Sequence, residues 1–279
     1  MKTTFYKIKA LTNIQPGSGE ATFGVVDNLV QFDPATDIPT IHGSSLKGAL
    51  REFMNKKLKE TQMKYIFGDP DGQGYYRFLS AQLIAIPMRS NKKMYYMATS
   101  PQVLKEFLTL TESLNYELNK LHPELEKDLK NLFEAEVQKN KPKVTGDKDG
   151  LYVEDFEDFE TLGIELNDKT KEFLGITDNN LILLNHEDFK NVVSADNLPV
   201  IARNQLDKGE SQNLWYEQVL PRFTVFVMPL IHTDEHFEDF NKKLTKEGPV
   251  HIGANASVGY GFTEFTNLSE NTQNNTTQS

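Results

Sequence analysis

The first residues of the chain alternate apolar and polar side chains. In FYKIKAL (5–11), Tyr6 and Ile8 fall on one face and Lys7 and Lys9 fall on the other. A period of two residues is typical of a β-strand. The pattern therefore predicts a half-buried strand, with one face in the core and the lysines in solvent.

A helical period follows a long stretch that is rich in glycine and proline. Between about Ser45 and Glu60, apolar residues beginning with Leu46 recur on one arc at 100° per residue. Lys47 and Arg51 lie on the flank of this arc, and a spacing of four residues makes them neighbours on the surface. The sequence predicts one amphipathic helix here.

Later apolar runs predict the rest of the architecture. Strands are expected at 77–88, 181–185, 198–203 and 222–231, and helices at 101–137, with a break at Pro123, and at 236–248. A strand–helix–strand order therefore occurs near both ends of the chain. This order predicts an α+β fold of the split βαβ, ferredoxin-like type.

The same pattern predicts a single domain over residues 1–266. Two long insertions are expected, at about 13–42 and 105–195, and a hairpin with a turn-rich tip at about 198–217. The final segment, 267–279, contains mainly Asn, Thr, Gln and Ser, a composition that predicts a disordered tail.

Composition narrows the class of protein. The chain has 279 residues and no cysteine, which excludes disulfides and thiolate zinc sites and favours a reducing, cytoplasmic location. No apolar run approaches the roughly 20 residues of a membrane span, so no membrane partner is expected. The net charge of −10 opposes nucleic-acid binding, but the acidic excess is concentrated late, as at 154–160, so a local basic face remains compatible with it.

The stretch GSSLKGALR has the features of an anion-binding site. The first amides of a helix have no internal acceptor and carry the positive end of the dipole. Gly43 allows close approach, Ser44 and Ser45 can donate to an oxygen, and Lys47 and Arg51 add charge. A phosphate group fits such a site. The alternative is that Ser44 or Ser45 is only an N-cap and the two cations are solvated.

A second candidate for close phosphate approach is the loop GANASVGYG (253–261). Gly253, Gly259 and Gly261 give it a surface without bulky side chains. It is not a Walker loop, because no GK[ST] follows, and a tight turn explains such a loop equally well.

These stretches together resemble the RAMP superfamily of CRISPR effector proteins, and within it the backbone subunit of the type III-B (Cmr) complex. The blocks 16–52, 83–104 and 200–226 carry the closer resemblance. It implies a modified ferredoxin-like (RRM-like) fold with long insertions and a β-hairpin thumb. It also implies that several copies, with other Cmr-type subunits, line a guide CRISPR RNA as a filament, and that paired target RNA is cut at regular intervals.

The resemblance also implies site residues. The catalytic aspartate of the family's Gly-Val-Val-Asp stretch falls on Asp27, which would act as general base or hold a divalent cation, Mg²⁺ or Mn²⁺. In the thumb, Arg203 and Asn204 would contact the displaced nucleotide, and Leu206 or Leu214 would wedge between bases. Without the resemblance, Asp27 would be interpreted as a turn-capping residue.

Some positions depart from the family pattern or leave choices open. Gln218 follows Glu217 where a second acidic residue is frequent, and Tyr260, expected to pack, stands where a cation is frequent. Arg89 follows a central strand and is expected to extend the basic face. One alternative is a non-catalytic guide-RNA-binding backbone subunit, as in complexes that target DNA. A guide-processing RAMP endonuclease is another, which only His42 supports.

Overall fold

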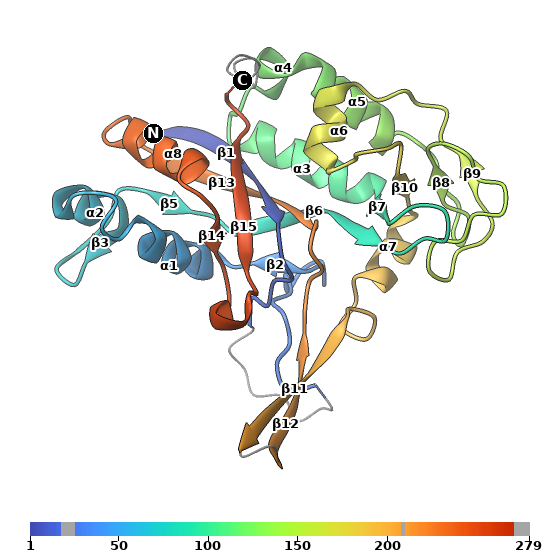
Figure 1. Cartoon of the computed structure of the whole chain (residues 1–279). Coiled ribbons are helices and arrows are strands. Elements are labelled where there is room, and N and C mark those ends of the chain that lie inside the picture. The colour runs from blue at the N-terminus through green and yellow to red at the C-terminus, as the bar shows by residue number, and fades with distance from the viewer. Residues whose placement is uncertain (18–25, 208–209, 271–279) are drawn as a thin grey trace, which may run out of the picture.

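The computed structural model describes residues 1–17, 26–207 and 210–270, which form one large sheet with helices on both faces (Figure 1). The sheet order is β14-β15-β1-β13-β6-β7-β10-β8-β9, with the short strands β2 and β5 beside β6 and β13. The strands of this sheet are β1 (Lys2–Ala10), β2 (Thr40–Ile41), β5 (Arg77–Phe78), β6 (Ala81–Met88), β7 (Tyr96–Thr99), β8 (Lys143–Val144), β9 (Glu160–Thr161), β10 (Leu181–Leu183), β13 (Val225–His232), β14 (Val250–His251) and β15 (Phe262–Asn267).

Four of these strands and two helices form the predicted ferredoxin-like frame. The two frame helices are α1 (Gly43–Met54) and α8 (Phe237–Lys246). A further helix, α2 (Glu60–Phe67), follows α1. The units β1-α1-β6 and β13-α8-β15 interlock, because β1 pairs antiparallel with both β13 and β15 and β13 pairs antiparallel with β6. The split βαβ prediction is therefore confirmed.

The insertion after β7 widens the sheet and covers its second face. It contains α3 (Pro101–Ser113), α4 (Leu118–Leu121), α5 (Pro123–Phe133), α6 (Asp168–Leu174) and α7 (His186–Val192). Tyr6 and Leu46 belong to the core under α1 and α8, whereas Phe5 and Phe107 belong to the core on the face covered by the insertion. Ser100 caps α3 as expected, accepting from the Val103 amide at 3.3 Å.

The prediction that Lys7 faces solvent is wrong. The residue is only 7% exposed, because α6 lies over this part of β1, and its Nζ donates to the Glu172 carbonyl at 3.0 Å. Burial lowers the pKa of Lys7, since a desolvated ammonium is disfavoured. The strand is thus buried on both faces.

Two predicted boundaries also need correction. The helix expected at 45–60 is two helices: α1 ends at Met54, Asn55 leaves the helical conformation, and Lys56 adopts a left-handed φ of 65°. The predicted tail begins too early, because Asn267 completes β15 and Leu268 is 8% exposed. Residues 271–279 lie outside the described residues.

A two-stranded hairpin projects from the sheet at the bottom of Figure 1. It consists of β11 (Val200–Asp207) and β12 (Glu210–Gln218), close to the predicted range of 198–217. A small separate hairpin, β3 (Gly68–Asp69) and β4 (Gly72–Gln73), follows α2. None of the helices that the structure describes is long and apolar enough to cross a membrane.

Candidate nucleic-acid interface

The N-terminus of α1 presents two open backbone amides. His42 is the N-cap, and its side chain makes no capping bond. The Gly43 amide donates to Ser80 Oγ at 3.2 Å. Within the described part of the chain, no acceptor reaches the amides of Ser44 and Ser45. These two donors can therefore hold an oxyanion.

Ser45 is fixed by the loop that carries Asp27. Its Oγ accepts from Gln31 Nε2 at 2.9 Å, and Gln31 Oε1 accepts from the His42 amide at 2.7 Å. Gln31 is 6% exposed and therefore joins this loop to the start of α1. The alternative that Ser44 or Ser45 is the N-cap is wrong, because His42 occupies that position.

Lys47 and Arg51 give this helix start a positive charge. Lys47 is half-buried and Arg51 is exposed. Neither forms an ion pair with any carboxylate among the described residues. Both charges therefore remain available to a polyanion beside the open amides.

Gly43 has a different role from the predicted one. A Cβ at this position would lie 2.3 Å from the Phe78 carbonyl oxygen, so the missing side chain allows α1 to pack on β5. This contact supports a packing role for Gly43 and gives no support to the predicted close approach of a ligand.

Replacing Gly43 with alanine should therefore destabilise the fold. We expect Gly43→Ala to lower the free energy of unfolding by about 1–3 kcal/mol, because α1 must shift away from β5. Gly48→Ala is the matched control on the same helix: no atom lies within 4 Å of its added Cβ, and it should stabilise by about 0.5–1 kcal/mol. Urea denaturation measures both, and equal effects of the two changes would contradict the packing role.

Asp27 lies on the surface, at the base of the projecting hairpin. Its amide donates to the Tyr216 carbonyl at 3.0 Å, and its Oδ2 accepts from the Tyr216 amide at 2.8 Å. The next residue, Asn28, bridges in parallel to Glu217. Asp27 is exposed and is held against β12 by its own backbone and side chain.

Glu217 joins the Asp27 loop, the hairpin and the glycine-rich loop. The residue is 4% exposed, and its carboxylate accepts hydrogen bonds from four donors: Trp215 Nε1 at 2.8 Å, Asn255 Nδ2 at 2.8 Å, Arg203 Nη1 at 3.2 Å and Asn28 Nδ2 at 3.4 Å. A buried carboxylate with several donors is stable only in a fixed arrangement. Glu217 is therefore a positioning residue for the Asp27 loop, a role that the sequence analysis missed.

The family departure at Gln218 has a structural explanation. Gln218 is fully buried, and its Oε1 accepts from the Val30 amide at 3.1 Å while its Nε2 donates to the Ala195 carbonyl at 2.6 Å. A carboxylate at this position could not make the second bond.

Arg203 belongs to the Glu217 cluster. Its guanidinium pairs with Glu217 and lies 5.7 Å from the Trp215 ring and 5.6 Å from the Tyr260 ring. Its side chain is 21% exposed. These contacts give Arg203 a structural role and place Tyr260 in packing, whereas Asn204 and Leu214 are exposed. The side chain of Leu206 lies outside the described residues.

The glycines of the 253–261 loop differ in how much space surrounds them and in how exposed they are. A Cβ at Gly253 would lie 2.3 Å from the Gln15 carbonyl oxygen, and one at Gly261 would lie 2.3 Å from that of Ile252. Gly261 is also buried, which does not fit the predicted RNA contact, whereas Gly253 is exposed. Gly259 has a φ of 85° and open space around it, so Gly253 and Gly259 remain the two glycines that fit a surface contact.

Arg89 does not extend the basic face. It pairs with Glu154 at 3.6 Å, and the neighbouring ion pairs are Lys92–Asp147 at 2.7 Å and Lys93–Asp178 at 3.4 Å. Arg89 also follows the far end of β6, about 25 Å along the strand from the residues that pair beside α1. Arg89 therefore lies apart from the start of α1, in a region where acidic residues of the insertion pair with the cations.

A groove and a hydrogen bond link the remaining groups. An open groove lined by residues that include Ser45, Phe53, His251 and Gly253 connects α1 with the glycine-rich loop. Asn255 of that loop reaches Glu217, beside Asp27. Across the described ranges, no cluster of three His, Cys, Asp or Glu side chains is suited to a metal ion.

Comparisons with known proteins identify the family and the fold. A family model described as the RAMP superfamily matches residues 7–264. The chain is 30% identical to the CRISPR system Cmr endoribonuclease Cmr4 of Pyrococcus furiosus, with 98% of each chain covered. A cryo-EM structure of the type III-B Cmr-beta complex in the apo state contains a chain with the same fold, at a TM-score of 0.80 and 23% identity, covering 96% of this chain and 98% of that one. Oligomeric Cmr4 from P. furiosus has a TM-score of 0.67 at 22% identity, with 96% and 98% covered.

Proposed function

We propose that this chain, which belongs to the RAMP superfamily, is the repeating backbone subunit of a type III-B CRISPR complex. In this role it cleaves the target RNA that pairs with the guide RNA of the complex. The full-length relative in P. furiosus is named a Cmr endoribonuclease. The observation that carries the proposal is the exposed Asp27 carboxylate, fixed on β12 in the same loop as Gln31, which hydrogen-bonds to the start of α1.

Guide RNA is held through its backbone. The amides of Ser44 and Ser45 donate to a phosphate oxygen, and Lys47 and Arg51 neutralise the chain on either side. None of these groups reads a base, so one subunit can hold any guide sequence. Base pairing with the guide then selects the target.

Cleavage uses the nucleophile that RNA carries. When the hairpin displaces a target nucleotide, its 2′-hydroxyl can align with the adjacent phosphate. Asp27 then removes the hydroxyl proton as general base, the 2′-oxygen bonds to phosphorus, and the 5′-oxygen leaves and takes a proton from water. Its Oδ2 accepts from the Tyr216 amide, which orients the carboxylate, and Glu217 accepts from the side chain of the neighbouring Asn28. The products would be a 2′,3′-cyclic phosphate and a 5′-hydroxyl.

The described residues do not supply a protein-bound metal centre. Asp27 offers one carboxylate, and that of Glu217 is buried with four donors. Any Mg²⁺ or Mn²⁺ would therefore depend mainly on RNA phosphates and water, and we assign no step to it. We nevertheless expect EDTA to stop target cleavage and leave target binding intact, with Mg²⁺ or Mn²⁺ restoring cleavage. Unchanged cleavage in EDTA would exclude the divalent cation.

Loss of the Glu217 charge should loosen this site. In Glu217→Gln, the Arg203 guanidinium loses its counter-ion and the new amide faces other N–H donors, so we expect about 2–4 kcal/mol of destabilisation in urea. Glu136→Gln, on an exposed carboxylate, is the control and should be neutral. A neutral Glu217→Gln would show that the four bonds add no net stability.

The proposed function is tested by reconstituting the chain with guide RNA and other Cmr-type subunits. A labelled complementary RNA should yield fragments at regular spacing, and a non-complementary RNA should stay intact. Tight target binding without fragments would favour a non-catalytic backbone subunit. We place the complex in the cytoplasm, where a chain without cysteine meets guide and target RNA.

A further inference from the structure

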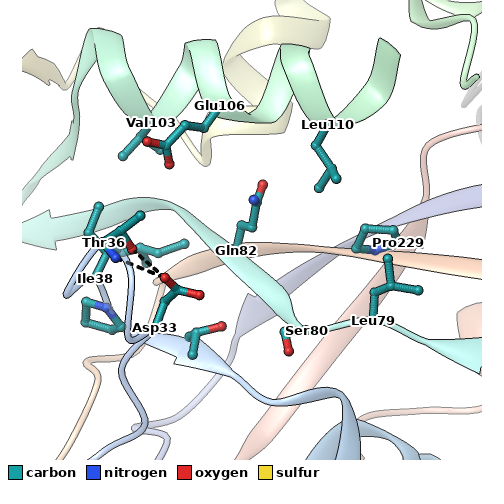
Figure 2. A pocket seen from close by; sticks show the side chains of 13 residues that line it. Asp33, Thr36, Ile38, Leu79, Ser80, Gln82, Val103, Glu106, Leu110 and Pro229 are labelled. Atoms are coloured by element: carbon teal, nitrogen blue, oxygen red, sulfur yellow. Dashed lines mark hydrogen bonds between the residues drawn. The ribbon is translucent and has the colours of Figure 1, made fainter. Parts of the chain in front are cut away.

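A pocket outside the RNA interface lies between α3 and the start of β6 (Figure 2). Its cavity volume is about 290 Å³, enough for one long side chain. Its walls are mainly apolar and comprise Ile38, Leu79, Leu83, Val103, Leu110 and Pro229. An extended aliphatic stem would be well packed between them.

Two carboxylates face this pocket from opposite sides. Asp33 Oδ1 is occupied by its own turn, accepting from the amides of Ala35 and Thr36 at 3.0 Å. Glu106 Oε1 accepts from Gln102 Nε2 at 3.0 Å. In the described part of the chain, the second oxygen of each carboxylate has neither a hydrogen-bond donor nor an ion-pair partner.

The lining selects a cation with an apolar stem. The Gln82 side chain points from β6 into the pocket toward α3, between Glu106 and Leu110, and makes no hydrogen bond among the described residues (Figure 2). Asp33, Glu106 and Gln82 thus offer three acceptors, which matches the three donors of a lysine ammonium. The negative charges repel RNA phosphate, and the apolar walls match the lysine methylenes.

Among the basic side chains of this chain, lysine is a better candidate than arginine to occupy the pocket. Among the five arginines, Arg77, Arg89, Arg203 and Arg222 already have carbonyl, carboxylate or ring partners, and Arg51 belongs to the RNA interface. Several lysines are exposed and have no ion pair within the described ranges: Lys56, Lys59, Lys105, Lys127 and Lys242.

We propose that this pocket receives a lysine side chain from the neighbouring copy of this chain and thereby joins consecutive copies along the guide. The inference rests on the proposed function, in which copies repeat. A head-to-tail repeat joins two different patches, here an acidic pocket and an exposed lysine. Because each copy has a net charge of −10, a local pair of opposite charge also favours the correct contact over repulsion.

Carbodiimide coupling tests the contact directly, because it links a carboxylate only to an amine in ion-pair contact. Equal amounts of ¹⁴N- and ¹⁵N-labelled protein are assembled on guide RNA, coupled and digested for mass spectrometry. We expect mixed-isotope peptides that join Asp33 or Glu106 to a lysine, and their loss in Asp33→Asn/Glu106→Gln. The absence of such peptides, or coupling only to a different subunit of the complete complex, would overturn the proposal.

Sedimentation of guide-loaded protein provides the second readout. Asp33→Asn/Glu106→Gln should weaken association between copies at least about tenfold, and the matched exposed pair Glu124→Gln/Glu134→Gln should not. Both variants should bind an RNA that holds only one copy as wild type does, which also verifies folding. Assemblies of unchanged length would refute the lysine contact, whereas a wild-type chain that fails to bind guide would refute the proposed function itself.

Discussion

Asp27→Asn should reduce target cleavage by about 10²–10⁴-fold and leave target binding within about twofold of wild type. Asparagine keeps an oxygen that can accept from the Tyr216 amide, so the loop should stay on β12. It cannot take the proton of the 2′-hydroxyl. The measurement is the single-turnover cleavage rate of a labelled target in the reconstituted complex.

Two further variants separate catalysis from positioning. Asp37→Asn removes an exposed carboxylate from the same segment and should cut at the wild-type rate. Asp27→Ala removes both the charge and the bond to Tyr216. If Asp27→Asn cuts normally and only Asp27→Ala is inactive, Asp27 holds the loop and another group performs the chemistry.

Loss of the two cations on α1 should produce the largest effect on RNA binding. In Lys47→Ala/Arg51→Ala, guide affinity per copy should fall about 10–100-fold, because two phosphate contacts disappear. The slope of log affinity against log salt should decrease in magnitude by about 1.4, at about 0.7 per contact on a single strand. Fluorescence titration of a short guide at several salt concentrations measures both quantities.

Lys105→Ala/Lys127→Ala is the matched control for that experiment. These lysines are exposed on α3 and α5, which cover the opposite face of the sheet from α1. Their removal changes the net charge equally and should leave the salt slope unchanged. If both pairs lower affinity to the same extent, binding depends on total charge and α1 has no special seat.

The ferredoxin-like frame could be predicted because its evidence is local. The alternation around Tyr6 and the helical spacing after Leu46 are visible within a few residues. The prediction that Lys7 faces solvent failed because its partner is distant in sequence. Glu172, which accepts the hydrogen bond from its ammonium group, is 165 positions away, in an insertion whose fold the pattern did not indicate. Tertiary packing overrode the strand period there.

The candidate site was predictable only in part, for the same reason. The resemblance located Asp27, and helix-terminus physics located the open amides of Ser44 and Ser45. The Glu217 cluster joins residues as far apart as Asn28, 189 positions away, and Asn255, 38 positions away. The packing role of Gly43 against Phe78 could not be predicted from the sequence either, because it depends on which strand packs against the helix.

A structure of the guide-loaded assembly with target RNA bound and Asp27→Asn preventing cleavage tests the central claim most directly. The account predicts a guide phosphate within hydrogen-bond distance of the Ser44 and Ser45 amides, and a displaced target nucleotide whose 2′-hydroxyl faces residue 27. RNA that runs along another face of the sheet, or a target strand remote from the base of the hairpin, would contradict it.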